Sequence, residues 1–237
     1  MKKLSEKTYR RYIANTVIIF IFAMLISLTY IGQTTSVFSS NSYEPYYCGN
    51  KTLKNVSLMF NVYMGTEYID GILDTLEKGG ATATFFVGGS WAIKNDDLVK
   101  KIFNSGHEIA NHGYWHKDHK KISVEKNREE IYLTHKVVKS ITGYDMTLFA
   151  PPSGSFGDNT LKVAQDLGYK KILWTKDTID WRDKDENLIY SRAIKNPQNG
   201  DLILMHPTEC TLKSLSKIIS FYNNQGYKLT TVLENIS

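Results

Sequence analysis

The chain has 237 residues, of which 42% are hydrophobic and 22% are charged, as in globular proteins and unlike disordered, collagenous or coiled-coil chains. Its 2 cysteines, Cys48 and Cys210, exclude a disulfide-dense scaffold and a cysteine-rich zinc module. The formal net charge is +5, but residues 1–11 hold five cationic side chains and one acidic one, so the remainder is nearly neutral. No basic stripe is left for nucleic acid, which is excluded as a partner.

An uncharged apolar stretch follows the basic N-terminal segment. Residues 12–31 read YIANTVIIFIFAMLISLTYI, and about twenty such residues are enough to cross ~30 Å of hydrocarbon as a helix. Because cations lie only on its N-terminal side, we predict a cytoplasmic tail over 1–11, a transmembrane signal anchor over 12–32 and an extracytoplasmic remainder. The chain would then be a single-pass protein of the cell membrane. A cleaved signal peptide is the alternative, although no small-x-small site follows the stretch.

A polar, Ser/Asn-rich segment then separates the anchor from a domain. We predict a stalk over 33–50 and a folded domain over 51–237. Export to an oxidising compartment would allow a disulfide between Cys48 and Cys210. Two free thiols are the alternative, and the sequence does not decide between them.

Short apolar runs and amphipathic helical patterns alternate through the domain. The expected strands are 56–60, 82–87, 107–111, 147–150, 171–175, 202–205 and 228–232, and the expected helices are 67–78, 96–104, 123–142, 159–167, 186–194 and 212–223. This alternation predicts βαβ crossovers and therefore an α/β fold with a parallel sheet. An incomplete α/β barrel and a doubly wound sheet both fit, and in either one the active face is formed by the carboxyl ends of the strands.

Histidines follow the third expected strand at a spacing that suits a metal. His112 and His116 form an H-x-x-x-H pair, and His119 supplies a third imidazole in principle. Neutral imidazoles are preferred ligands of zinc, and a catalytic zinc site needs about three protein ligands. Three ordinary surface histidines in a polar loop are the alternative.

Other candidate groups lie at the ends of later strands. His206 ends the strand 202–205 and is a candidate acid–base group, because imidazole titrates near neutral pH. Asp177 and Asp180 could hold such a histidine and raise its pKa, and helix capping is their alternative role. Aromatic side chains such as Trp181 and Tyr114 could line a sugar groove, although single aromatics more often pack in a core.

Taken together and in order, these segments resemble the polysaccharide deacetylase family, also called the NodB-type domain. The resemblance extends from about residue 56 to 233, and its motifs are ATATFFVGG at 81–89, GHEIANHGYWH at 106–116, APPSGSF at 150–156, ILWTKDTIDW at 172–181 and DLILMH at 201–206. It implies a distorted (β/α)7-type barrel and a hydrolase that removes N-acetyl groups from amino-sugar polymers. It also implies a divalent metal, zinc being the first choice, and an N-acetylated cell-wall glycan as partner.

The resemblance also assigns roles to individual residues. It implies that His112 and His116 bind the metal, and that His206 is a general acid tuned by Asp180. Asp177 belongs to the same motif as Asp180. Separately from the resemblance, the residues predicted to lie against substrate are Trp181, Pro151, Pro152 and Tyr114, with a purely structural turn as the alternative role of the two prolines.

Two departures from the family pattern affect the expected chemistry. The family has paired aspartates after the first strand, one the general base and the next a metal ligand, whereas this chain has Asn61 and Val62. An asparagine cannot accept a proton as a carboxylate does, and a valine cannot bind a metal. The family's arginine before the Pro-Pro pair is Ala150 here. The apolar second position and the APPSG motif resemble a subgroup tied to endospore-forming bacteria.

These departures leave two functions open. The first is a membrane-anchored peptidoglycan or polysaccharide N-deacetylase with weakened or altered activity, since loss of a general base costs about 10²–10⁴ in rate. The second is a non-catalytic member that binds cell-wall glycan in sporulation or envelope assembly. A different hydrolytic reaction is a minor alternative, and a transmembrane partner-binding protein with no glycan role is a distant third.

Overall fold

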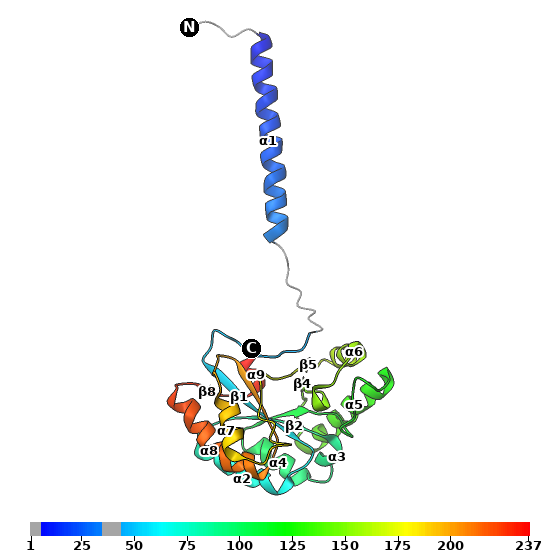
Figure 1. Cartoon of the computed structure of the whole chain (residues 1–237). Helices are drawn as coiled ribbons and strands as arrows, with labels where there is room; N and C mark the ends of the chain where they lie inside the picture. Colours follow the sequence, from blue (N-terminus) through cyan, green and yellow to red (C-terminus); the bar gives the residue numbers. More distant parts are fainter. Residues whose placement is uncertain (1–5, 35–43) are drawn as a thin grey trace. The chain divides into compact units, whose positions relative to one another are not determined.

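A computed structural model describes residues 6–34 and 44–237 and divides the chain into two compact units, Met1–Ser42 and Tyr43–Ser237. The first unit contains one helix, α1 (Glu6–Thr34), drawn in blue in Figure 1. The start of the predicted cytoplasmic tail (1–5) and half of the predicted stalk (35–43) lie outside the described residues.

In the described part of the chain, no helix is both long enough and apolar enough to cross a membrane.

The second unit is built on one parallel sheet of eight strands, counted over the described residues (Figure 1). Its order is β5-β4-β3-β2-β1-β7-β6, with β8 beside the start of β1. The strands are β1 (Asn55–Val62), β2 (Thr84–Val87), β3 (Glu108–Asn111), β4 (Leu148–Phe149), β5 (Lys170–Lys171), β6 (Lys176–Asp177), β7 (Asp201–Met205) and β8 (Lys228–Leu229). Every pairing is parallel, so the predicted α/β fold with a parallel sheet is confirmed and takes the form of a half-barrel.

Both ends of the sheet belong to one stretch of chain, residues 170–177. Its first residues pair with β4 and its last residues pair with β7. In the middle of this stretch, the backbone N–H of Leu173 donates to the carbonyl of Tyr46 at 2.8 Å. Tyr46 belongs to the predicted stalk. The single strand predicted over 171–175 is therefore wrong, because this stretch changes hydrogen-bonding partners in the middle.

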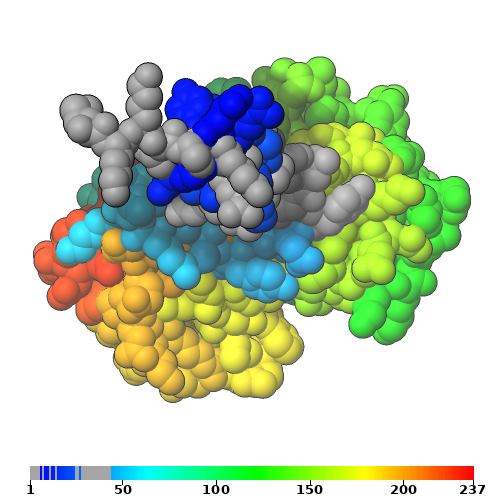
Figure 2. All heavy atoms as spheres, turned by 90° about the horizontal axis from the view of Figure 1, so that it is seen from above, coloured from blue at the N-terminus to red at the C-terminus, as the bar shows by residue number. Residues whose placement is uncertain are grey.

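Residues 44–50 belong to the second unit and precede the domain start expected at residue 51. The N–H of Gly49 donates to the carbonyl of Gly200, and the N–H of Asn50 donates to the carbonyl of Asn235, each at 2.7 Å. In Figure 2 this light-blue segment lies on the surface of the unit beside the orange and yellow segments. Cys48, in the same segment, and Cys210 are both free, so the structure contains no disulfide between them.

Helices connect the strands, and six of them lie at the positions that the amphipathic patterns predict, whereas α3 and α9 were not predicted. They are α2 (Ile69–Lys78), α3 (Gly89–Ala92), α4 (Asp96–Asn104), α5 (Val124–Thr142), α6 (Asp158–Asp166), α7 (Glu186–Ile194), α8 (Glu209–Asn224) and α9 (Val232–Asn235), with short 3-10 turns η1 (Thr66–Tyr68) and η2 (Pro152–Gly154). The hydroxyl of Ser123 caps α5 by accepting the N–H of Lys126 at 3.3 Å. The predicted last strand is too long, because Thr231 caps α9 and ends the extended segment.

Alternation along β1 divides the core into two clusters on opposite faces of the sheet. Val56, Leu58, Phe60 and Val62 belong to the larger cluster, which includes side chains from α2, α4, α5 and α8. Met59 belongs to a smaller cluster with residues of β2, β3, β4 and β7. Successive side chains of a strand point to opposite faces, so Asn61 lies on the face of Met59 and Val62 lies on the helix-covered face.

Candidate active site

A cavity of about 240 Å³ lies at the carboxyl ends of the strands, where a parallel α/β sheet places its active face. It receives side chains from β1, β6 and β7 and from the segments that follow β3 and β4. The lining residues are Asn61, Tyr63, His116, Ser153, Trp174, Asp177, Trp181, Leu204 and His206. The sequence-predicted residues His206, Asp177, His116, Asn61 and Trp181 are thus brought together.

The end of β1 supplies two of the lining side chains and turns a third away. Asn61 and Tyr63 are two residues apart and both line the cavity. Val62 lies between them, is 0% exposed and packs in the larger hydrophobic cluster. The position at which the family has a metal-binding aspartate is therefore occupied by an apolar side chain that faces the core.

His206 and Asp180 form a buried pair. The Nδ1–H of His206 donates to Oδ1 of Asp180 at 2.8 Å, and the backbone N–H of His206 donates to Oδ2 at 2.6 Å. The hydroxyl of Thr211 donates to the same Oδ2 at 2.5 Å. Because a carboxylate only accepts hydrogen bonds, these contacts place a hydrogen on Nδ1 and fix the orientation of the imidazole.

Asp177 lines the cavity but holds a turn rather than the histidine. Its Oδ1 accepts the backbone N–H of Ile179 at 2.8 Å. Ile179 has φ +55°, a left-handed conformation that a β-branched residue rarely adopts. Of the two aspartates that the sequence singled out, Asp180 contacts His206. Asp177 instead stabilises the turn that leads from Asp177 to Asp180.

His112, the first residue after β3, has a ring nitrogen without a hydrogen-bond partner. It is 0% exposed, and its Nδ1–H donates to the carbonyl of Ala150 at 2.8 Å. Burial, with a further contribution from His116, holds the pKa of His112 well below the usual histidine value. The ring is therefore neutral, and its Nε2 has a free lone pair with no hydrogen-bond partner.

His116 lies close enough to His112 to share an ion with it. Burial also lowers the pKa of His116, and the two ring centres are 5.2 Å apart. Two imidazoles bound to one tetrahedral zinc ion, at Zn–N distances of about 2.0–2.1 Å, have ring centres about 5 Å apart. The pair therefore has the spacing of two ligands of one metal ion.

A third protein ligand does not complete this pair. The Nδ1 of His119 is hydrogen-bonded to Oδ1 of Asn127 at 2.7 Å. Its Nε2 lies against Gly113, so close that a Cβ added to this glycine would be 2.9 Å from it. Across residues 6–34 and 44–237, no three His, Cys, Asp or Glu side chains are placed to hold a metal ion. Since a catalytic zinc site needs about three protein ligands, the described side chains do not fit one.

Tyr63 is the site residue that sequence reasoning missed. Its ring centre lies 3.8 Å from that of His116, 6.1 Å from that of His112 and 6.0 Å from that of His206, which it meets edge-on. Burial raises the pKa of the Tyr63 phenol, so the side chain is neutral at physiological pH. The ring thus lies between the pair His112 and His116 on one side and His206 on the other. The signal in the sequence was its spacing of two residues from Asn61.

The remaining predicted substrate residues are placed less directly. Trp181 is 55% exposed and forms one wall of the cavity. Pro151 and Pro152 are buried in the turn before Ser153 and do not line the cavity described above. Tyr114 packs edge-on against Trp115 at 4.9 Å and against Gly89 of α3, also outside the cavity lining.

Trp174 was also missed, and a glycine makes room for it. A Cβ on Gly154 would come within 2.8 Å of the Trp174 ring, and Gly154 has φ +64°. Both the close approach and the positive φ require glycine at this position. The Pro-Pro-Ser-Gly turn therefore serves to seat an aromatic wall of the cavity.

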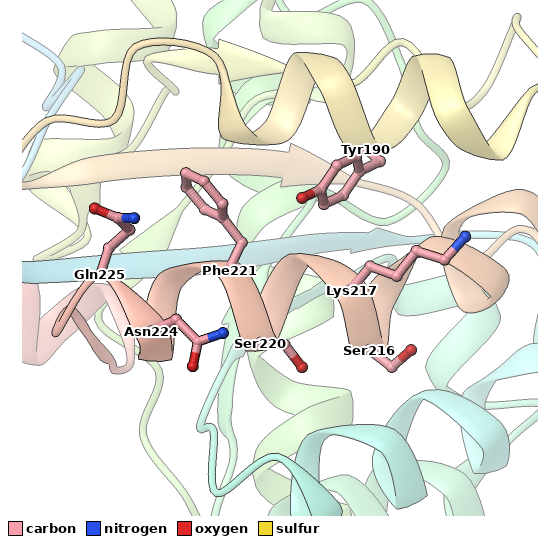
Figure 3. Close-up of a pocket in the computed structure, with 7 residues that line it drawn as sticks. All are labelled: Tyr190, Ser216, Lys217, Ser220, Phe221, Asn224 and Gln225. Atoms are coloured by element: carbon pink, nitrogen blue, oxygen red, sulfur yellow. The ribbon is translucent and has the colours of Figure 1, made fainter.

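A second hollow, of about 450 Å³, lies on the outer surface between α7 and α8 (Figure 3). Its lining has no carboxylate, imidazole or thiol and consists of Tyr190, Ser216, Lys217, Ser220, Phe221, Asn224 and Gln225. Metal chemistry therefore has no imidazole, carboxylate or thiol ligand there. The cavity at the strand ends, which brings the sequence-predicted residues together, is the candidate active site.

The chain is similar to an uncharacterised protein and to a protein named as a peptidoglycan deacetylase. Uncharacterized protein YlxY of Bacillus subtilis (strain 168) is 38% identical over 191 residues, covering 81% of this chain and 60% of the relative. Peptidoglycan-N-acetylglucosamine deacetylase PgdA of Listeria monocytogenes is 32% identical over 185 residues, covering 78% of this chain and 39% of PgdA. The match thus spans less than two thirds of the length of either relative.

Solved structures give the same family. Wild-type BA3943, described as a CE4 family pseudoenzyme from Bacillus anthracis, has a TM-score of 0.80 at 36% identity, covering 83% of this chain and 70% of that chain. A BA3943 mutant described as having restored enzymatic activity has a TM-score of 0.80 at 34% identity, covering 83% of this chain and 72% of that chain. A family model for polysaccharide deacetylase matches residues 49–172. The chain belongs to the polysaccharide deacetylase family.

Proposed function

We propose that this chain binds an N-acetylated cell-wall glycan in the cavity at the strand ends and does not deacetylate it. The glycan class is supported by PgdA, a relative named as a peptidoglycan-N-acetylglucosamine deacetylase. The absence of hydrolysis is supported by BA3943, a structural neighbour described as a pseudoenzyme. Of the two functions left open by the sequence, the geometry favours the non-catalytic one.

The observation that carries this proposal is the end of β1. Amide hydrolysis needs a group that takes a proton from the attacking water, and Asn61 offers an amide in place of a carboxylate. The neighbouring Val62 faces the hydrophobic core, so it leaves the histidine pair without a third ligand. Loss of the base alone costs about 10²–10⁴ in rate, and loss of a metal ligand adds to that cost.

The cavity retains what a sugar-binding site needs. Tyr63, Trp174 and Trp181 supply aromatic faces against which the C–H face of a sugar ring packs. Asn61 and His206 supply polar atoms for hydroxyl and amide groups. At about 240 Å³ the cavity is smaller than the roughly 300–1,000 Å³ that encloses a drug-sized ligand, so it suits one sugar residue of a longer glycan.

The proposal includes the single-pass position in the cell membrane expected from the sequence, with the glycan-binding unit outside, although no described helix meets the length and apolarity of a membrane span. It is supported by the uncharged stretch 12–31 behind a basic tail. Large side chains of α1 are also between 48% and 74% exposed: Tyr9, Tyr12, Ile13, Val17, Ile18, Ile19, Phe20, Ile21, Phe22 and Met24. Apolar surface of this kind needs a covering partner, and a bilayer supplies one. Recovery of the full chain in the soluble fraction after cell lysis would refute the anchor.

Acetate release tests the absence of hydrolysis. The full chain, kept in detergent with excess zinc, is incubated with N-acetylated peptidoglycan beside the His206→Ala variant, which lacks the acid-type imidazole. We expect both proteins to release acetate at the same background rate. A rate in the natural chain that clearly exceeds that of His206→Ala would overturn the proposal and support a weakened deacetylase.

A further inference from the structure

Asn61 has an unused hydrogen-bond acceptor inside the cavity. The side chain is 2% exposed, and its Oδ1 has no hydrogen-bond partner. Buried polar atoms in folded proteins are nearly always paired, and an unpaired one calls for an explanation, such as an ordered water, an ion or a ligand that supplies the partner. Because Asn61 lines the cavity, a ligand bound there can supply a donor to it.

The chemistry of the asparagine side chain defines the donor. A carboxamide has an N–H donor and a C=O acceptor on adjacent atoms, and the acetamido group of an N-acetylated sugar has the same two groups. The two amides can therefore pair, the sugar N–H donating to Oδ1 and the Asn61 amide donating to the sugar carbonyl. A carboxylate at this position, as in the family's catalytic members, offers acceptors only.

We propose that Asn61 recognises the intact acetamido group, so that this site distinguishes acetylated glycan from deacetylated glycan. This inference rests on the proposed glycan binding and adds to it the feature of the glycan that is read. Asn61 is then a specificity-determining residue rather than a damaged general base.

The rest of the cavity suits an acetyl group. The apolar side chains of Leu204 and Trp174 line it together with the Tyr63 ring, and they offer a surface for the acetyl methyl. Removal of the acetyl group leaves a cationic amine without the carbonyl or the methyl. Asp177 is the carboxylate in the cavity lining that could attract such a cation, so the two forms of the glycan favour different residues of the site.

Calorimetry with two oligomers separates these preferences. The full chain in detergent at pH 7 is titrated with the N-acetylglucosamine trimer and, separately, with the glucosamine trimer. We expect the acetylated trimer to bind at least about tenfold more tightly, since one well-made hydrogen bond in a buried site accounts for about that factor. Equal binding, or tighter binding of the glucosamine trimer, would overturn the inference.

Variants test the residue itself. Asn61→Ala and Asn61→Leu remove the amide, the second at nearly constant volume, and either variant that keeps the far-UV spectrum of the natural chain is informative. Both are expected to lose the preference for the acetylated trimer, and a preference that survives in them would refute the role of Asn61. The matched control is Asn224→Ala, at an exposed asparagine of the outer hollow (Figure 3), which leaves the preference unchanged.

Failure of the inference and failure of the proposed function give different results. If the natural chain binds both trimers equally, the glycan-binding function stands and the reading of the acetyl group falls. If the natural chain binds neither trimer nor peptidoglycan, the glycan-binding function itself falls.

Discussion

Acidification is expected to destabilise the second unit through His119. This side chain is 1% exposed, its Nδ1 is hydrogen-bonded to Oδ1 of Asn127 at 2.7 Å, and its Nε2 has no partner. Burial lowers the pKa of His119 from 6.5 to about 4. Between these two values the unfolded chain binds a proton that the folded chain does not. The stability is therefore complete above about pH 6.5 and is lost as the pH falls toward 4.

The size of the effect follows from the two pKa values. A difference between 6.5 and about 4 reduces the free energy of unfolding by about 3 kcal/mol when the pH reaches 4. Domains of ordinary size have free energies of unfolding of about 5–15 kcal/mol, so this loss is a large fraction of the total.

Urea unfolding followed by tryptophan fluorescence measures the effect. The free energy of unfolding is compared at pH 7 and pH 4 for the natural chain and for His119→Gln, which keeps a polar group near Asn127 but does not titrate. We expect His119→Gln to lose about 3 kcal/mol less than the natural chain on acidification. His135→Gln, at a partly exposed histidine, controls for the general loss of an imidazole. The same acid-induced loss in His119→Gln and the natural chain would refute the argument.

Three further predictions concern the site. Asp180→Ala leaves three buried donors without their acceptor and is expected to cost at least about 3 kcal/mol of stability, whereas Asp177→Ala removes one hydrogen bond and is expected to cost about 1 kcal/mol. Thermal unfolding of the two variants compares these costs, and equal costs would contradict the geometry. Gly154→Ala places a Cβ within 2.8 Å of Trp174 at φ +64° and is expected to weaken glycan binding at least several-fold; unchanged affinity would show that Trp174 does not contact the glycan. Treatment with EDTA is expected to leave the melting temperature and the glycan affinity unchanged, because the described histidines form only a two-ligand pair; a clear drop in either would reveal a metal that stabilises the site.

Much of the fold was predictable because each element carries a local signal. The helices α4 (Asp96–Asn104) and α7 (Glu186–Ile194) have the predicted bounds. The segment 171–175 was not predictable, because its middle is bonded to Tyr46, which a polar linker pattern gives no reason to place beside it. The last strand was overestimated because the capping role of Thr231 depends on the chain turning there.

The candidate site was predictable where a residue type implies its own chemistry. The position of His206 after a buried strand led to a buried histidine held by Asp180. The role of Tyr63 was not predictable in this way, since a tyrosine after a strand is equally at home in a core or on a surface. Only the alternation along β1, which turns Val62 to the core and Tyr63 to the cavity, shows that an aromatic ring stands between the histidines.

The fate of a bound glycan tests the central claim most directly. The N-acetylglucosamine trimer is incubated with the full chain and excess zinc and is then recovered from the complex. Its molecular mass is measured by mass spectrometry. The structure predicts that the trimer is recovered with all of its acetyl groups, because Asn61 offers an amide at the position of the family's general base and an amide does not take a proton from water. Recovery of a trimer that has lost an acetyl group, in an amount that depends on His206, would contradict this account.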